Sequence, residues 1–165
     1  MSEAKLKLAP LKEVIFELQW AGGVDTNGNP IDDGFDLAQG KLAEKLKIEY
    51  PVHKKLIPDG IPFRIFGVPL HQYWKDEFKC PVIQHGSGIL AVNDVEINYE
   101  WEQTYKPIVI SAINSLINSY DEPIKFNKAK LQYIDAWDYH EQDPKDFVKD
   151  NLIRLLSANL TLQNL

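Results

Sequence analysis

Hydrophobic and polar residues alternate at the start of the chain and then change to a helical spacing. Between Leu11 and Trp20, apolar residues occupy every second position, and glutamate or glutamine fills most of the others. Alternate side chains of a strand point to opposite faces, so this pattern predicts a half-buried strand. After a loop rich in glycine and asparagine, apolar residues recur at steps of three or four and predict a helix over residues 35–50. This stripe consists of Phe35, Ala38, Leu42 and Leu46.

The sequence pattern in the middle of the chain predicts short strands separated by turns. Residues 52–62 contain two prolines and a glycine and are typical of a loop. A second strand starts at Phe63 and bends toward Trp74. Residues 81–95 predict a strand that is interrupted at residues 86–88 by Gly-Ser-Gly, which is either a bulge or the tip of a hairpin.

A broad apolar face predicts a second helix over residues 99–120. Pro107 lies inside this pattern and lacks a backbone donor, so we expect either a kink there or a helix that begins near Lys106. Residues 126–137 alternate again and predict a last strand. Asp143, followed by proline, is a typical start of one more helix.

This order of elements predicts an α+β fold. We expect a two-layer sandwich of an antiparallel or mixed sheet with helices on one face, in the ferredoxin-like β-α-β-β-α-β order plus a C-terminal helix. A length of 165 residues fits a single domain over residues 1–165. The alternating apolar end at Leu165 indicates a further strand or the N-terminal part of a longer protein.

Composition and charge narrow the class of protein. The formal net charge of −6 argues against a basic nucleic-acid-binding surface, so no nucleic acid is expected as a partner. A single cysteine, Cys80, excludes an internal disulfide and a cysteine zinc cluster. The first residues contain no long apolar run, so we expect a cytoplasmic protein with no membrane partner.

Three segments resemble a sporadically distributed, uncharacterised family of bacterial proteins. They are the strand motif Pro-Leu-x-Glu-x-x-Phe-Glu at residues 10–17, residues 82–84 with Val92 and Asn93, and residues 131–136. Asp135 stands where the family pattern has asparagine. The resemblance implies no activity and no catalytic residues. The family's patchy distribution implies an association with mobile or defence-related genes.

The loop before the first helix has the spacing of a calcium ligand set. Oxygen donors fall at its first, third, fifth, ninth and twelfth positions, as in an EF-hand, although Pro30 occupies the sixth position, where glycine is usual. The alternative is a solvated turn that leads into an acidic helix start. The candidate metal ligands are Asp25, Asn27, Asn29, Asp33 and Asp36.

A second acidic cluster lies between Asp135 and Asp143. On a strand, Asp138 and His140 would face the same side, where they could hold a metal or act as an acid–base pair. The alternative is a polar loop in which Asp143 caps the next helix.

Two further groups are candidates for catalysis. Cys80 with His71 or His85 could form a nucleophile and base, but a lone cysteine beside proline is typical of a small buried side chain. Residues 86–88 could cradle a phosphate, but they lead into a strand and lack the continuation of a P-loop, so they predict a turn. No catalytic residue and no cofactor are therefore assigned.

Aromatic and basic residues suggest a partner surface. Trp20 and Trp137 share the apolar face of their strands and are predicted in the core. Lys125, Lys128 and Lys130, together with Arg64, form a basic strip that would meet an acidic partner or remain a solvated face. The residues expected to contact a partner are His71, Tyr73, Trp74 and Trp101.

These observations favour a non-enzymatic binding protein of bacteria that acts by contact with another protein, as an accessory or antitoxin-like factor. An open sheet edge also permits a homodimer. The alternative is a metal-dependent enzyme that uses the acidic cluster at Asp25–Asp36 or the one at Asp135–Asp143.

Overall fold

The computed structural model describes residues 11–57, 65–77, 79–95, 99–136 and 144–147. The chain divides into two compact units, residues 1–135 and residues 136–165. In the second unit only Ala136 and the short helix α3 (Pro144–Phe147) are described. The single domain expected over residues 1–165 stays a prediction.

The first unit contains the sheet and the two longer helices. Both α1 and α2 start close to where the apolar spacing predicts them. In chain order its elements are β1 (Leu11–Trp20), β2 (Gly23–Val24), β3 (Pro30–Ile31), α1 (Phe35–Leu46), β4 (Val52–Lys55), β5 (His71–Trp74), β6 (Val82–Gly86), β7 (Ile89–Asp94), the π-helical turn η1 (Trp101–Tyr105), α2 (Lys106–Ile117) and β8 (Phe126–Asp135).

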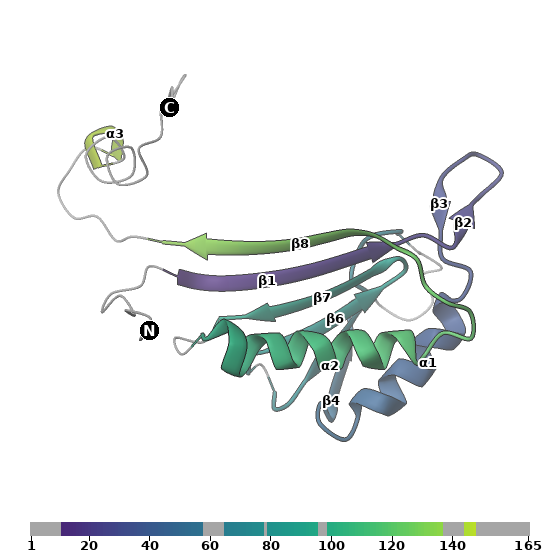
Figure 1. The fold of residues 1–165 in the computed structure, drawn as a ribbon, viewed down its shortest axis with the longest axis horizontal. Coiled ribbons are helices and arrows are strands. Elements are labelled where there is room, and N and C mark those ends of the chain that lie inside the picture. Colours follow the sequence, from purple (N-terminus) through teal and green to yellow (C-terminus); the bar gives the residue numbers. More distant parts are fainter. Residues whose placement is uncertain (1–10, 58–64, 78, 96–98, 137–143, 148–165) are drawn as a thin grey trace. The chain divides into compact units, whose positions relative to one another are not determined.

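Six strands form one sheet in the order β4-β5-β6-β7-β1-β8, and each strand is antiparallel to its neighbours. β2 and β3 form a separate two-stranded hairpin (Figure 1). The α+β class and the antiparallel sheet are confirmed. The ferredoxin-like order is not confirmed, because β4 and β5 extend the sheet beyond β6.

Strand β4 corrects one prediction. Residues 52–55 were expected in a loop, but they pair with β5 at the edge of the sheet. A short edge strand that ends in Lys54 and Lys55 has no clear alternation, and charged side chains are common on such edges. The next strand, β5, begins at His71, and residues 58–64 lie outside the described residues.

One face of the sheet carries the core. The register places Phe16, Val92, Ile83 and Tyr73 in one row across four strands, so their side chains share a face. Both helices pack on this face (Figure 1), because residues of each belong to the same buried cluster as Val92. The helical members are Leu42 and Leu46 from α1 and Val109, Ala112 and Leu116 from α2.

The second helix starts as Pro107 requires. α2 begins at Lys106, with the proline in its first turn, and η1 precedes it. The buried hydroxyl of Tyr105 accepts a hydrogen bond from the Phe16 amide (2.8 Å) and donates one to the Val92 carbonyl (2.6 Å). Phe16 and Val92 oppose each other in the β1–β7 ladder, so this hydroxyl bridges the two strands.

The turn between β6 and β7 is a hairpin tip, which confirms one of the two alternatives predicted for residues 86–88. Gly88 has a φ of +71°, a left-handed conformation that favours glycine. A Cβ atom on Gly88 would also overlap the ring of Phe66. A Cβ atom on Gly86 would overlap the backbone carbonyl of Val68. The segment before β5 therefore passes directly over this hairpin.

Alanine substitution of two glycines should change stability in opposite directions. Gly86→Ala is expected to lower the free energy of unfolding by at least about 2 kcal/mol, because the backbone of Val68 must move. Gly40→Ala is the matched control, since α1 leaves its Cβ position open, and it should raise stability by up to about 1 kcal/mol. Urea unfolding of both variants measures this. Equal effects of the two substitutions would contradict the close approach.

Candidate functional site

The carboxylate of Asp32 is the most deeply buried acidic group among the described residues, with 5% of the residue exposed. Its Oδ2 atom accepts three hydrogen bonds. The donors are the indole N–H of Trp20 (3.2 Å), the backbone amide of Gly88 (3.0 Å) and the hydroxyl of Tyr120 (2.7 Å). The carboxylate thus joins the end of β1, the β6–β7 hairpin and the segment that follows α2.

The local sequence around Asp32 allows this convergence. Asp32 follows β3, and its carbonyl accepts the amide of Phe35 at the start of α1 (3.3 Å). A Cβ atom on Gly34 would lie 2.9 Å from the ring of Tyr120, so glycine at this position lets the ring approach the carboxylate. Burial, then the bond to Asp32, raises the pKa of Tyr120, which therefore stays protonated as a donor.

A cavity of about 470 Å³ opens beside this carboxylate. Its rim carries three acidic residues, Asp33, Asp121 and Glu122, and one basic residue, Lys125. Asp121 is paired with Lys41 of α1. The walls are mostly apolar or aromatic and are formed by Trp20, Leu37, Ala38, Tyr120, Pro123 and Ile124. A volume of this size with few polar groups is typical of a small-molecule pocket.

Three histidines gather on the core face of β4, β5 and β6. Nε2 of His53 and Nδ1 of His71 share a hydrogen bond of 2.9 Å. His85 is fully buried between the rings of Trp20 and Phe35, and neither of its ring nitrogens has a partner among the described residues. Burial lowers the pKa of His71 to about 4 and that of His85 to about 3. Both rings are therefore neutral at pH 7.

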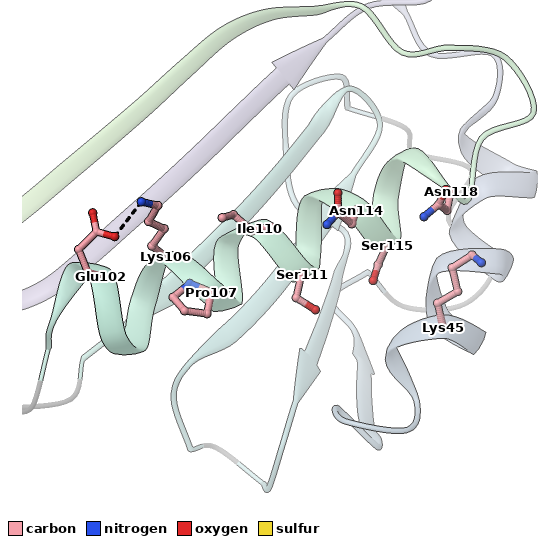
Figure 2. A pocket seen from close by; sticks show the side chains of 9 residues that line it. All are labelled: Lys45, Glu102, Lys106, Pro107, Ile110, Ser111, Asn114, Ser115 and Asn118. Carbon is pink, nitrogen blue, oxygen red and sulfur yellow. Dashed lines mark hydrogen bonds and ion pairs between the residues drawn. The ribbon is translucent and has the colours of Figure 1, made fainter.

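A second hollow, of about 670 Å³, lies along the outer side of α2 (Figure 2). Lys106 and Glu102 form an ion pair at one end of this hollow (2.7 Å), and Lys45 of α1 lies near the other end. Between them Figure 2 shows mainly small polar side chains such as Ser111 and Asn114. None of the residues that line it is a buried charged group.

The predicted calcium ligands lie in and after the β2–β3 hairpin. Oδ1 of Asp25 accepts the amides of Asn27 and Asn29 (2.8 Å each), and Oδ2 accepts Nδ2 of Asn29 (3.0 Å). These bonds, that of the Asn29 side chain first, lower the pKa of Asp25. Asp33 is exposed, and Asp36 lies in the first turn of α1.

Within the described ranges, no three histidine, cysteine, aspartate or glutamate side chains come together as a metal site. The loop carboxylate of Asp25 is instead engaged by its own hairpin. A calcium site there stays a prediction. In the second acidic cluster, Asp135 is exposed at the end of β8, and residues 137–143 lie outside the described residues.

The predicted partner residues are divided between the core and its margins. His71 and Tyr73 point into the core from β5. Trp74 is half-buried on the opposite face of that strand, and Trp101 is half-buried in η1. Of the residues weighed as a nucleophile and base, Cys80 is half-buried and His85 is buried. A partner-binding role of these side chains stays a prediction.

The sequence pattern did not single out the Asp32 site. In sequence, Asp32 belongs to the acidic stretch before α1 and Tyr120 ends the predicted second helix, and neither pattern marks a contact between them. One signal was available, because a buried tryptophan needs a partner for its N–H, and Trp20 was predicted in the core. The acceptor could not be chosen from sequence, since Gly88 and Tyr120 reach Asp32 only in the folded chain.

No protein-family model, curated protein or solved structure matches the chain. The resemblance to a bacterial family therefore stays an expectation. In the parts of the chain that the structure describes, no helix is both long and apolar enough to cross a membrane.

Removal of the Asp32 carboxylate should strongly destabilise the fold. Asp32→Ala leaves two buried donors and one half-buried donor without an acceptor, and each such loss costs about 1–3 kcal/mol, so we expect a decrease of at least about 3 kcal/mol in the free energy of unfolding. Asp33→Ala, one residue away and exposed, should change it by less than about 0.5 kcal/mol. Chemical unfolding compares the two variants, and similar losses would refute the role of Asp32.

The buried histidines should make the fold sensitive to mild acid. Below pH 6.5 the unfolded chain binds protons that the folded chain excludes, so stability falls as the pH drops from about 6.5 toward 4. The slope is up to about 1.4 kcal/mol per pH unit for each such histidine. His85→Phe should reduce this slope between pH 7 and 5. Leu42→Ala, a core control, should lower stability at every pH and leave the slope unchanged.

Proposed function

We propose that this chain is a non-enzymatic binding protein that contacts another protein along the free edge of β8. Support comes from the position of this strand. β8 is ten residues long, contains no proline and pairs with β1 on one side only, so its other edge has no strand partner among the described residues. Backbone groups along a long open edge can pair with an extended segment of another chain.

The side chains of β8 indicate the kind of segment that would fit. On the core face, Leu131 and Tyr133 are 39% and 48% exposed. On the opposite face, Lys128 and Lys130 are exposed and form no ion pair with any described residue. An extended segment in which apolar and acidic residues alternate would complement both faces.

Strand β1 already illustrates this complementarity on the inner side of β8. Phe16 of β1 lies opposite Leu131, and Glu17 lies opposite Lys130. A partner strand of similar alternation would continue the sheet outward. This mode of contact suits an accessory or antitoxin-like factor, because it needs no reacting group. The bacterial setting rests on the family resemblance, and no contact among the described residues favours the metal-dependent enzyme.

Charge reversal on β8 tests this proposal. The tagged full chain is used to capture partners from the source cell, and quantitative mass spectrometry compares wild type with Lys128→Glu/Lys130→Glu. Lys45→Glu/Lys47→Glu, at the C-terminal end of α1, changes the net charge equally and serves as the control. We expect the control to retain a partner that has an acidic extended segment. The β8 variant should capture at least about tenfold less of that partner, because the reversed charges on β8 would repel the acidic segment.

Two results would contradict the proposal. One is that no captured protein depends on Lys128 and Lys130 while thermal melting shows that both variants are folded. The other is that size-exclusion chromatography finds a stable homodimer that the β8 substitutions dissociate, because a second copy would then occupy the edge in place of a different partner.

A further inference from the structure

We infer that the cavity beside Asp32 binds a small organic cation, such as a primary ammonium group attached to an apolar body. This site is separate from the β8 edge. It is formed by the loop before α1, the end of β1 and the segment after α2.

The first argument is a missing positive charge. Asp32 is almost fully buried, and its three donors, Trp20, Gly88 and Tyr120, are all uncharged. No lysine or arginine among the described residues forms an ion pair with it. Buried carboxylates are normally paired with a cation, because a lone charge is costly to remove from water. A bound cation would supply this counter-charge.

The second argument is a free acceptor atom. All three hydrogen bonds to the carboxylate end on Oδ2, and Oδ1 receives no donor from the described part of the chain. Asp32 is also one of the residues that line the cavity. An ammonium group there would donate to Oδ1 and form a charge-assisted hydrogen bond.

The remaining walls fit an organic cation. Asp33 and Glu122 add negative charge at the rim, where Lys125 is the only basic residue that lines the cavity in the described part of the chain. The rings of Trp20 and Tyr120 stand perpendicular to each other with centroids 5.9 Å apart, and aromatic rings attract cations. Leu37, Pro123 and Ile124 offer an apolar surface for the rest of the molecule.

A metal ion fits this cavity less well than an organic cation does. Calcium takes six to eight oxygen ligands, and magnesium needs a near-octahedral set. The described residues contain no cluster of three acidic, histidine or cysteine side chains that could hold a metal. Apolar walls would also leave a hydrated ion poorly solvated. One carboxylate oxygen beside aromatic and aliphatic side chains matches an ammonium group with an apolar body.

The indole N–H of Trp20 provides a direct readout, because it donates to the same carboxylate. Hexylammonium and tryptammonium are titrated into the ¹⁵N-labelled full chain and compared with the neutral 1-hexanol. We expect saturable shifts of the Trp20 indole signal with both amines and binding of the alcohol that is at least about tenfold weaker, since the alcohol lacks the charge. Equal binding of hexanol and hexylammonium, or no saturable shift with either amine at 10 mM (about the weakest useful range for a small ligand), would overturn the inference.

Substitutions separate the role of the charge from that of the fold. Asp32→Asn keeps the shape of the side chain and should weaken amine binding at least about tenfold. Glu44→Gln, on the exposed side of α1, makes the same change in net charge and should leave binding unchanged.

Two rim variants keep the test valid if Asp32→Asn does not fold. Leu37 is 69% exposed, so Leu37→Lys should fold normally and weaken amine binding about two- to fivefold by repulsion. Lys125→Gln should strengthen it by a similar factor. Unchanged amine affinity in both rim variants would count against the site. The β8 variants should bind the amines like wild type, so this test fails or succeeds independently of the proposed protein partner.

Discussion

The buried carboxylate of Asp32 is the contact that fixes the end of the sheet to the helices. Its three neutral donors come from β1, from the β6–β7 hairpin and from the segment after α2, so one atom positions three parts of the chain. The same group lines the cavity beside it. Stability and ligand recognition therefore depend on one side chain, and a change that improves one can impair the other.

The elements with the strongest periodicity could be predicted from sequence. β1, α1, α2 and β8 have clear alternation or a clear helical stripe, and the effect of Pro107 on the start of α2 follows from proline geometry. β4 could not, because a four-residue strand that ends in two lysines provides too few positions for a pattern. β5 was expected only as the bent end of a strand that starts at Phe63. Their place at the sheet edge depends on pairing with β6 and with each other.

The sites were less accessible to sequence reasoning. Regular spacing near Asp25 predicts a metal loop, and this stays a prediction. The spacing did not reveal that the Asp25 carboxylate also accepts the amides of its own turn, a common local use of aspartate. His53, His71 and His85 are far apart in sequence and meet only through the register of three neighbouring strands. The hydrogen-bond donors to Asp32 also come from distant parts of the sequence and meet only in the folded chain. Local patterns identify elements, but they do not identify such convergences.

The sheet order also has a consequence for how the chain acquires its structure. β1 is synthesised first, yet its two neighbours, β7 and β8, come much later in the sequence. The strands β4 to β7 pair in chain order and can assemble from nearby segments. In contrast, β1 can pair only after the distant strands β7 and β8 are available. On the ribosome, an apolar strand therefore remains without its partners until nearly the whole first unit has emerged. That interval is when the nascent chain is most exposed to misassociation with other chains.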